Sequence, residues 1–536
     1  MNVELSQNKG TSWFSLNDVH VKGYIFDETN NYLTDEALCQ YFMKVSSLKE
    51  LRAKLRSANG SFAVVSQQSN IKFAAVDRLR SIPIFFSMSE NNCTSICDSI
   101  QHSSKHAIDN VSVLEYLSAS YVPGHNTLYE NYKQISAGEF LLFGDAGVNI
   151  ERYYSHYHQP IDGRSEQQYF DELDDVTSNI SDRLLKSAQG RQLVVPLSGG
   201  YDSRYIVSLL AKSGYRNILC YTYGIESSYE VRIAREVCRT LGVNWEFIEY
   251  HDSDWEQYSA SENVLGFYDF TINGVACPHV QEYIAIEKLI NKELVTSDSI
   301  FVPGFCGDLL GGSYVPADCT EKSNGDKLVG TALVDYIFNE YLFLGNILSS
   351  QEEEAIKSRL SETLNGKTWA NDLVDFVSTT QDWFTREKVA KYVMNSLRVY
   401  EYFGFEWRTV LWDNELAEYW YAVPISERTD NPLYERFLFA NLFDPLEIGL
   451  RKPEFRDNSR LRMLAKTILP RNVSMRLRSI YHRLIGKKHD INAFSHLHNK
   501  YDADLKKISV HKLKSNRIQQ IVSAWVIHKY LNIPPS

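Results

Sequence analysis

Hydrophobic and polar positions alternate over short distances in the first third of the chain. Short apolar runs are separated by polar or glycine-containing turns, a pattern typical of β-strands. The clearest runs are 61–67, 71–76, 82–87 and 139–144. Two helical patches interrupt them, at 35–56 and near 112–119. Residues 1 to about 155 are therefore predicted to form a strand-rich domain.

The pattern changes after about residue 165. A long amphipathic stretch, 166–188, leads into a buried-strand run that ends in glycines. Helical and strand patterns then alternate, which is typical of a parallel sheet with crossover helices. The predicted helices are 203–213 and 228–241, and the predicted strands are 217–223 and 245–250. From about residue 330 onward the pattern is mainly helical.

Composition narrows the class of protein. The 536 residues are 44% hydrophobic and 23% charged, which suits packed cores in roughly two to four domains. The net charge of −11 argues against a general nucleic-acid binder. The segment from residue 451 onward is nevertheless rich in Lys and Arg. It could face phosphates, an anionic partner or a membrane surface, or form an ordinary solvated helical face.

The eight cysteines show no paired pattern of zinc ligands, so we expect free thiols in a reducing compartment. The N-terminus lacks the features of a signal peptide. No run reaches the about 18 apolar residues of a membrane helix. We therefore expect a cytoplasmic protein with no transmembrane segment.

The most informative segment, V-V-P-L-S-G-G-Y-D-S-R at 194–204, runs from a buried strand into a helix. Adjacent glycines let the backbone turn sharply and bring several N–H groups close to an anion. The following helix adds the positive end of its dipole. Ser198 and Ser203 offer hydroxyls to phosphate oxygens, and Asp202 suits a Mg²⁺ bridge to the phosphates. The segment is neither a Walker loop nor a G-x-G-x-x-G motif.

A second glycine-dense loop, V-P-G-F-C-G-D-L-L-G-G, occupies 302–312. It surrounds one carboxylate, Asp308. Hard cations prefer shells of carboxylate and phosphate oxygens. Asp202 and Asp308 are therefore predicted to hold Mg²⁺ together on a departing pyrophosphate.

The first loop resembles the pyrophosphate loop of ATP pyrophosphatases, and the two loops in this order resemble the synthetase domain of asparagine synthetases. That family carries S-G-G-x-D-S and a later G-x-G-S-D-E-x-x-G-G. Y-T-Y-G at 221–224 and Y-D-F-T at 268–271 resemble family segments near adenine and near the acyl substrate. The resemblance implies ATP contacts at Leu197, Ser198, Gly199, Gly200, Asp202, Ser203, Tyr223, Gly224 and Gly304. It implies substrate contacts at Glu230, Asp269 and Gly312.

The N-terminal part looks like a glutamine amidotransferase domain. The resemblance rests on N-G-S-F-A at 59–63, D-R-L-R-S-I-P-I at 77–84 and Y-V-P-G at 121–124. That domain uses a cysteine at position 2, exposed by removal of Met1, as its nucleophile. Here position 2 is Asn2. We expect that glutamine hydrolysis is absent and that the domain is structural or regulatory.

The family also places a catalytic lysine shortly after a Leu-Pro in its late helices. Here I-L-P occupies 468–470, and Arg478 stands where the lysine is expected. Arginine can stabilise a charged transition state but does not readily exchange a proton. Lys487 and Lys488 are the fallback candidates. The predicted catalytic residues are Asp202, Asp308 and Arg478.

The resemblance implies an α/β fold class. An Ntn-type α+β sandwich (1–155) would precede a doubly wound parallel-sheet ATP-pyrophosphatase domain (165–430), completed by a basic helical region (431–536). The implied chemistry cleaves ATP to AMP and pyrophosphate, with Mg²⁺, to activate a carboxylate that ammonia or an amine captures as an amide. A homodimer is compatible with the resemblance.

Several activities remain open. Within the same chemistry they are asparagine formation from aspartate and ammonia, amidation of another acid such as a uronic acid of a surface polysaccharide, and ring closure as in β-lactam synthetases or lasso-peptide cyclases. A non-catalytic ATP-binding scaffold is an alternative of a different class.

Overall fold

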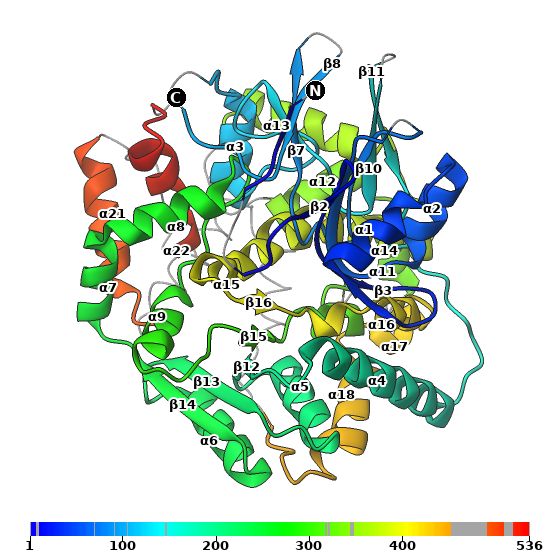
Figure 1. Cartoon of the computed structure of the whole chain (residues 1–536), viewed down its shortest axis with the longest axis vertical. Coiled ribbons are helices and arrows are strands. Elements are labelled where there is room, and N and C mark those ends of the chain that lie inside the picture. Colours follow the sequence, from blue (N-terminus) through cyan, green and yellow to red (C-terminus); the bar gives the residue numbers. More distant parts are fainter. Residues whose placement is uncertain are drawn as a thin grey trace.

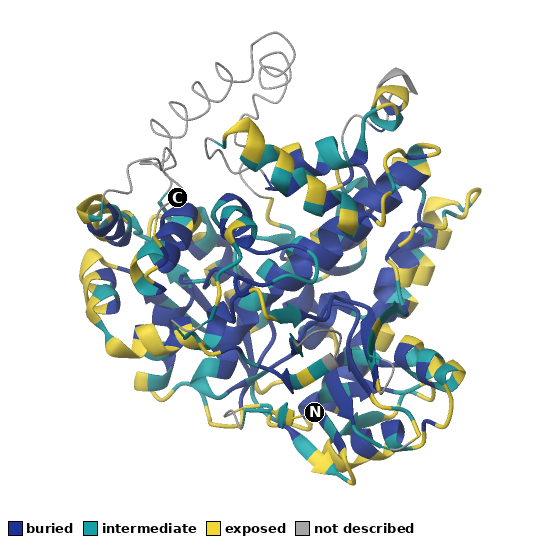
Figure 2. Cartoon of the chain, turned by 90° about the horizontal axis from the view of Figure 1, so that it is seen from above, coloured by how far each residue is buried: buried dark blue, intermediate teal, exposed yellow. Residues whose placement is uncertain are grey.

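The structure, a computed structural model, describes residues 2–6, 10–68, 70–89, 92–103, 106–144, 147–316, 319, 322–342, 348–451, 490–508 and 518–534. Figure 1 shows the arrangement of the elements, and Figure 2 shows that buried residues fill the interior while exposed ones gather on the outer faces of the helices.

The N-terminal part is a sandwich of two sheets with helices. One sheet has the order β1 (Asn2–Glu4), β8 (Asn92–Cys97), β7 (Phe85–Ser89) and β9 (Tyr132–Gln134). The other has the order β11 (Gly147–Arg152), β10 (Glu139–Gly144), β6 (Phe73–Val76), β5 (Asn59–Ser66), β3 (Val19–Phe26) and β2 (Phe14–Leu16), and β4 (Tyr32–Thr34) pairs with β3. Three helices belong to this part: α1 (Asp35–Met43), α2 (Leu48–Ser57) and α3 (Asn110–Ala119).

Strand β5 shows why this part folds as layers. Successive side chains of a strand point to opposite faces. Ala63 and Val65 pack between the two sheets with Ile84 and Phe86, whereas Val64 packs on the opposite face in the cluster that contains the α1 and α2 leucines. Both faces of the sheet are therefore buried, and the predicted α+β sandwich is confirmed.

The predicted helical patch 35–56 is divided in the structure. Helix α1 ends at Met43 and α2 begins at Leu48. The Ser47 hydroxyl caps α2 by accepting the Glu50 N–H at 3.2 Å. A serine N-cap favours a new helix start over continuation of the first helix.

A five-stranded parallel sheet forms the centre of the second part. Its order is β14 (Asn244–Glu249), β13 (Ile218–Gly224), β12 (Leu193–Pro196), β15 (Ile300–Phe301) and β16 (Glu406–Trp407). Helix α4 (Glu166–Ala188) precedes β12. Helix α5 (Tyr201–Lys212) follows β12, and helix α6 (Tyr229–Leu241) follows β13. The predicted parallel sheet with crossover helices is confirmed.

The strand order reverses at β12. Strands β13 and β14 extend the sheet on one side of β12, and β15 and β16 extend it on the other. In such sheets, ligands bind beyond the carboxyl ends of the strands at the reversal point. The loops after β12 and β15 both start at this edge.

The remaining described elements are mostly helical, and from about residue 330 onward this confirms the prediction. The α-helices among them are α7 (Asp252–Ala260), α8 (Glu262–Ile272), α9 (Tyr283–Asn291), α10 (Gly307–Gly311), α11 (Lys322–Val329), α12 (Leu333–Ile337), α13 (Ser350–Thr363), α14 (Leu373–Phe384), α15 (Arg398–Phe403), α16 (Asn414–Tyr421), α17 (Ile425–Arg428), α18 (Pro432–Phe437), α21 (Ser495–Lys507) and α22 (Ile518–Trp525). Helices in the described part of the chain fall short of the length and apolarity that a membrane crossing requires.

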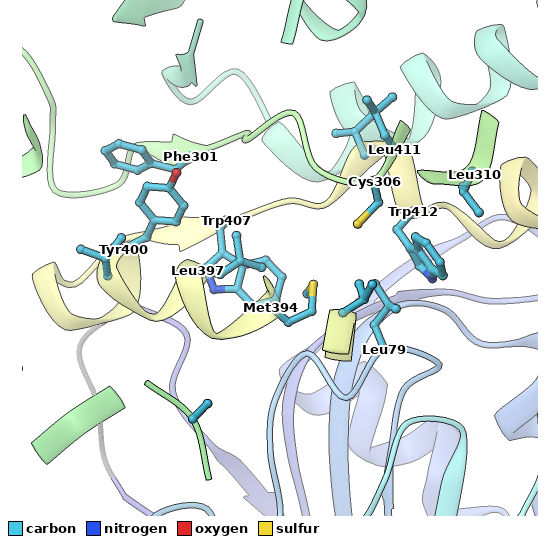
Figure 3. Close-up of a cluster of buried hydrophobic side chains, with 14 of the residues drawn as sticks. Leu79, Phe301, Cys306, Leu310, Met394, Leu397, Tyr400, Trp407, Leu411 and Trp412 are labelled. Carbon is cyan, nitrogen blue, oxygen red and sulfur yellow. The ribbon is translucent and has the colours of Figure 1, made fainter. Parts of the chain in front are cut away.

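The two parts share one hydrophobic core. Leu79 of the N-terminal part belongs to the same buried cluster as Met394, Trp412 and Cys306 of the second part, as Figure 3 shows. Burial of such side chains contributes about 1.5–3 kcal/mol each. The predicted boundary near 155 therefore separates segments of sequence that pack against one another.

A polar clamp joins the same two parts. The Asn59 Nδ2 group donates to Asp413 Oδ2 at 3.0 Å, and Asn59 Oδ1 accepts the Asn414 N–H at 3.0 Å. Arg183 donates to both oxygens of Asp413, at 2.7 and 2.9 Å. Asn59 begins the N-G-S-F-A motif, so in this chain part of that motif holds the interface to the second part. A cavity of about 40 Å³ lies beside the clamp, with room for a few water molecules.

A substitution at Asn59 tests how much the clamp stabilises the protein. Asn59→Asp keeps the shape of the side chain but removes its donor and places a second carboxylate against Asp413, which is mostly shielded from solvent. We expect the free energy of unfolding at pH 7 to fall by about 2–3 kcal/mol, measured by chemical denaturation.

Asn244→Asp is the matched control, because Asn244 is exposed at the start of β14. It should change stability by less than about 0.5 kcal/mol. Equal stability of the two variants would contradict the role of the clamp.

Candidate functional site

The first glycine loop lies between β12 and α5. The Leu197 N–H still donates to Tyr221 O at 2.8 Å, as a continuation of the sheet. The Ser198 hydroxyl then accepts the Gly200 N–H at 3.0 Å and lies 3.3 Å from the Ser203 hydroxyl. Both serines thus shape the turn by local hydrogen bonds, which short hydroxyl side chains favour.

The buried side chain of Arg204 is hydrogen-bonded to the backbone of the loop. Its guanidinium donates to the carbonyl oxygens of Gly200 (3.2 Å) and Gly199 (3.4 Å), and also to Leu450 O (2.5 Å). It lies 4.9 Å from the ring centre of Tyr201. Burial lowers the pKa of Arg204 to about 10, so it remains charged near neutral pH. The positive charge of Arg204 lies near the N-terminus of α5. It acts together with the helix dipole to favour a bound anion.

The second loop contacts the first at Asp202. Asp202 Oδ2 accepts the Asp308 N–H at 3.1 Å, and Asp202 Oδ1 accepts the Tyr434 hydroxyl at 2.8 Å. Gly304 lies against the backbone of Ser203: a Cβ at position 304 would be 2.6 Å from Ser203 N. The structure therefore brings Asp202, Ser203, Gly304 and Asp308 to one place.

The donor set at this junction fits a hard divalent cation. Asp202 is half-buried, and Asp308, whose N–H it accepts, is exposed at the start of α10. No group of three or more potential metal ligands of the His, Cys, Asp or Glu type occurs among the described residues. A cation there would complete its shell with phosphate and water oxygens, as Mg²⁺ commonly does. The metal role of both aspartates stays a prediction.

A second buried arginine, Arg428 of α17, holds the second loop. It donates twice to Leu310 O, from Nε at 3.1 Å and from Nη2 at 2.7 Å. Burial lowers the pKa of Arg428 to about 10. Gly312, predicted to contact substrate, has a φ of +122° and lies against the carbonyl of Arg428. Both features exclude a side chain, so packing alone accounts for this glycine.

Three other residues were predicted to contact ATP or substrate: Glu230, Tyr223 and Gly224. Glu230 is in the first turn of α6, next to Gly199: a Cβ at position 199 would be 3.3 Å from Glu230 Cα. Tyr223 stacks on Tyr250, with ring centres 5.4 Å apart. Gly224 is covered by Ile491, whose carbonyl accepts the Ile225 N–H at 2.9 Å.

Asp269 is not brought to the loops. It is exposed on α8, and its charge acts on Tyr129 and Tyr530. In Figure 1, α8 lies at the upper left, whereas α5 and α18 lie below the centre. Arg478 and its fallback candidates Lys487 and Lys488 lie outside the described residues.

Three residues at the site, Arg204, Arg428 and Tyr434, had no predicted role. A fourth, Glu282, supports β13 from within the core. Its carboxyl group accepts hydrogen bonds from the hydroxyls of Tyr221 and, at 3.0 Å, Tyr400, and burial raises its pKa to about 7. Arg204 ends the motif at 194–204, but its contact with Leu450 comes from a distant segment. The site contacts of Arg428, Tyr434 and Glu282 also come from distant elements, so no local motif indicates them.

A substitution at Gly304 tests whether the loops depend on its close contact with Ser203. In Gly304→Ala the new methyl group meets backbone atoms, which cannot rotate away. We expect a loss of about 1–3 kcal/mol in stability and faster hydrogen–deuterium exchange in 302–312, measured by mass spectrometry.

Gly144→Ala is the control, since nothing lies within 4 Å of a Cβ there. If Gly304→Ala exchanges in 302–312 as slowly as this control, the loops do not depend on the close approach.

Known proteins resemble both parts of the chain. The family model for asparagine synthase matches residues 183–506, and that for the glutamine amidotransferase domain matches residues 41–154. Asparagine synthetase [glutamine-hydrolyzing] 3 of Bacillus subtilis is 31% identical over 163 residues, which is 28% of this chain and 25% of that protein. A probable asparagine synthetase [glutamine-hydrolyzing] of Acanthamoeba polyphaga mimivirus is 22% identical over 288 residues, half of each chain. The chain thus spans half or less of the length of these relatives.

Among solved structures, an NH3-dependent NAD synthetase from Campylobacter jejuni aligns with 38% of this chain and 97% of its own, at 17% identity and a TM-score of 0.21. An NMN synthetase from Francisella tularensis aligns with 42% of this chain and 97% of its own, at 16% identity and a TM-score of 0.20. The asparagine synthase model covers more than half of the 536 residues, and the protein is therefore a member of the asparagine synthase family.

Proposed function

We propose that the protein is an AMP-forming amide ligase. It uses ATP to adenylate a carboxylate and transfers the acyl group to ammonia or an amine. The observation that carries this proposal is the hydrogen bond from the Asp308 N–H to Asp202, 3.1 Å. It joins the two loops at the edge of the sheet where the strand order reverses, the usual ligand position in such folds.

The first loop supplies the anion site of this reaction. Arg204 takes up the carbonyl oxygens of Gly199 and Gly200, and the Ser198 hydroxyl takes up the Gly200 N–H. Phosphate oxygens would therefore be bound at the N-terminus of α5, the next segment of the loop. The N-terminus of α5 and the charge of Arg204 favour the pyrophosphate that leaves. Tyr223 and Gly224 would lie near adenine, at the end of β13.

Asp202 and Asp308 would hold Mg²⁺ at the same edge. When bound, the ion neutralises charge that develops on the leaving phosphates. The chain's own contribution is to hold ATP and the acid for in-line attack of the carboxylate on the α-phosphate, a positioning effect. It must also exclude water, because water would hydrolyse the acyl-adenylate. We assign stabilisation of the transition-state charge to Arg478.

We propose free ammonia or an amine, and not glutamine, as the nitrogen donor. The relatives are named as glutamine-hydrolysing enzymes, but this chain carries Asn2 at the position of the nucleophile. Strand β1, which contains Asn2, pairs with β8 at the edge of its sheet. Asn59 is engaged by Asp413 and Asn414. The N-terminal domain would then be structural.

The acid is aspartate or a sugar acid such as a uronic acid, and we propose a cytoplasmic enzyme, which could act as a homodimer. The two acids are distinguished by products. With ATP, Mg²⁺ and ammonium, phosphorus NMR should show AMP and pyrophosphate only when the correct acid is present. Replacement of ammonium by glutamine should give no amide. Glutamine-dependent amide formation would contradict the proposed nitrogen source.

Asp202→Ala tests the site itself. We expect loss of pyrophosphate release by at least about 100-fold, because the variant removes both the contact between the loops and a metal ligand. Asp298→Ala, at an exposed turn, is the control and should retain activity. Unchanged turnover in Asp202→Ala would refute the assignment of the site.

A further inference from the structure

Tyr434 of α18 contacts both loops although it belongs to neither. Its side chain is 2% exposed, and its hydroxyl donates to Asp202 Oδ1 at 2.8 Å. The glycines of the second loop leave room for it. A Cβ at position 307 would lie 2.5 Å from the Tyr434 hydroxyl oxygen, and one at position 311 would lie 2.8 Å from its ring.

The ring of Tyr434 is itself fixed by aromatic neighbours. Trp420 packs edge to face at 5.8 Å between ring centres, and Tyr205 does so at 6.3 Å. Such edge-to-face pairs favour one ring orientation. Because α18 begins with Pro432 at its first turn, the backbone that carries Tyr434 is also restricted. The hydroxyl therefore has a defined position relative to Asp202.

An aspartate carboxylate rotates easily about its last side-chain bond. Here each oxygen accepts a hydrogen bond from a different element: Oδ1 from Tyr434 and Oδ2 from the Asp308 N–H. Two bonds on two oxygens fix the plane of the carboxylate. The carboxylate is then held in one orientation, as in the hydrogen-bonded carboxylates that support metal sites.

We propose that Tyr434 is a positioning residue that orients the Asp202 carboxylate toward the cation and pyrophosphate. The inference rests on the proposed function, because it takes Asp202 as a metal ligand.

Tyr434→Phe removes the hydroxyl and keeps the ring. We expect the affinity for Mn²⁺, used in place of Mg²⁺ with a non-hydrolysable ATP analogue, to fall about 10-fold or more. Electron paramagnetic resonance of free Mn²⁺ measures this binding without turnover. The thermal unfolding midpoint should stay close to that of the wild type, because the ring still fills the space beside Gly307 and Gly311.

Tyr205→Phe is the matched control. Tyr205 is also a buried tyrosine, on α5, but its hydroxyl bonds to Thr177 at 2.6 Å and not to Asp202. Its Mn²⁺ affinity should equal that of the wild type. Wild-type Mn²⁺ affinity in a folded Tyr434→Phe protein would overturn the proposal.

A double-mutant cycle separates this proposal from the proposed function. If Tyr434 acts through Asp202, Tyr434→Phe should add no further loss of Mn²⁺ affinity to Asp202→Ala. Additive losses would overturn the positioning role and leave Asp202 as a ligand. Wild-type affinity in Asp202→Ala would refute the metal site itself, and the positioning role with it.

Discussion

The carboxylate of Asp202 is the point on which the candidate site depends. It accepts hydrogen bonds from Asp308, 106 residues downstream, and from Tyr434, 232 residues downstream. Three distant stretches of chain thus meet at one side chain, at the edge of the sheet where the strand order reverses. Without this junction the two glycine loops would be separate turns on neighbouring strands. The junction holds the two loops close together. A reaction between two bound substrates requires such proximity.

Two buried arginines place positive charge at the loops. Arg204 donates to carbonyl oxygens of the first loop, and Arg428 donates to a carbonyl oxygen of the second. Within the described residues, neither forms an ion pair with a carboxylate at hydrogen-bonding distance. A buried cation without an ion pair is costly in free energy. The positive potential that remains can stabilise a bound polyphosphate, so the cost is consistent with an anion site and would be hard to explain in an empty scaffold.

Local patterns in the sequence were sufficient to predict much of the fold. The amphipathic stretch 166–188 coincides with α4, and the alternation after it corresponds to β12–β14 with α5 and α6. These predictions succeed because hydrophobic periodicity and glycine turns are properties of neighbouring residues. The loops at 194–204 and 302–312 were identified for the same reason, and the structure places them together.

Features that depend on distant contacts could not be predicted in this way. Nothing near Tyr434 in the sequence indicates that its hydroxyl meets Asp202, and nothing near Asn59 indicates Asp413 as its partner. Asp269 shows the converse: its local segment resembles a substrate-binding one, yet α8 holds it away from both loops.

The central claim is that a carboxylate attacks the α-phosphate of ATP. It is tested most directly with an acid whose carboxylate is labelled with ¹⁸O, by mass spectrometry of the nucleotide product. An acyl-adenylate route transfers one labelled oxygen to AMP, because the bond that breaks on amide formation leaves that oxygen on phosphorus. Label in AMP would confirm carboxylate activation. Unlabelled AMP, or ADP and phosphate in its place, would contradict it.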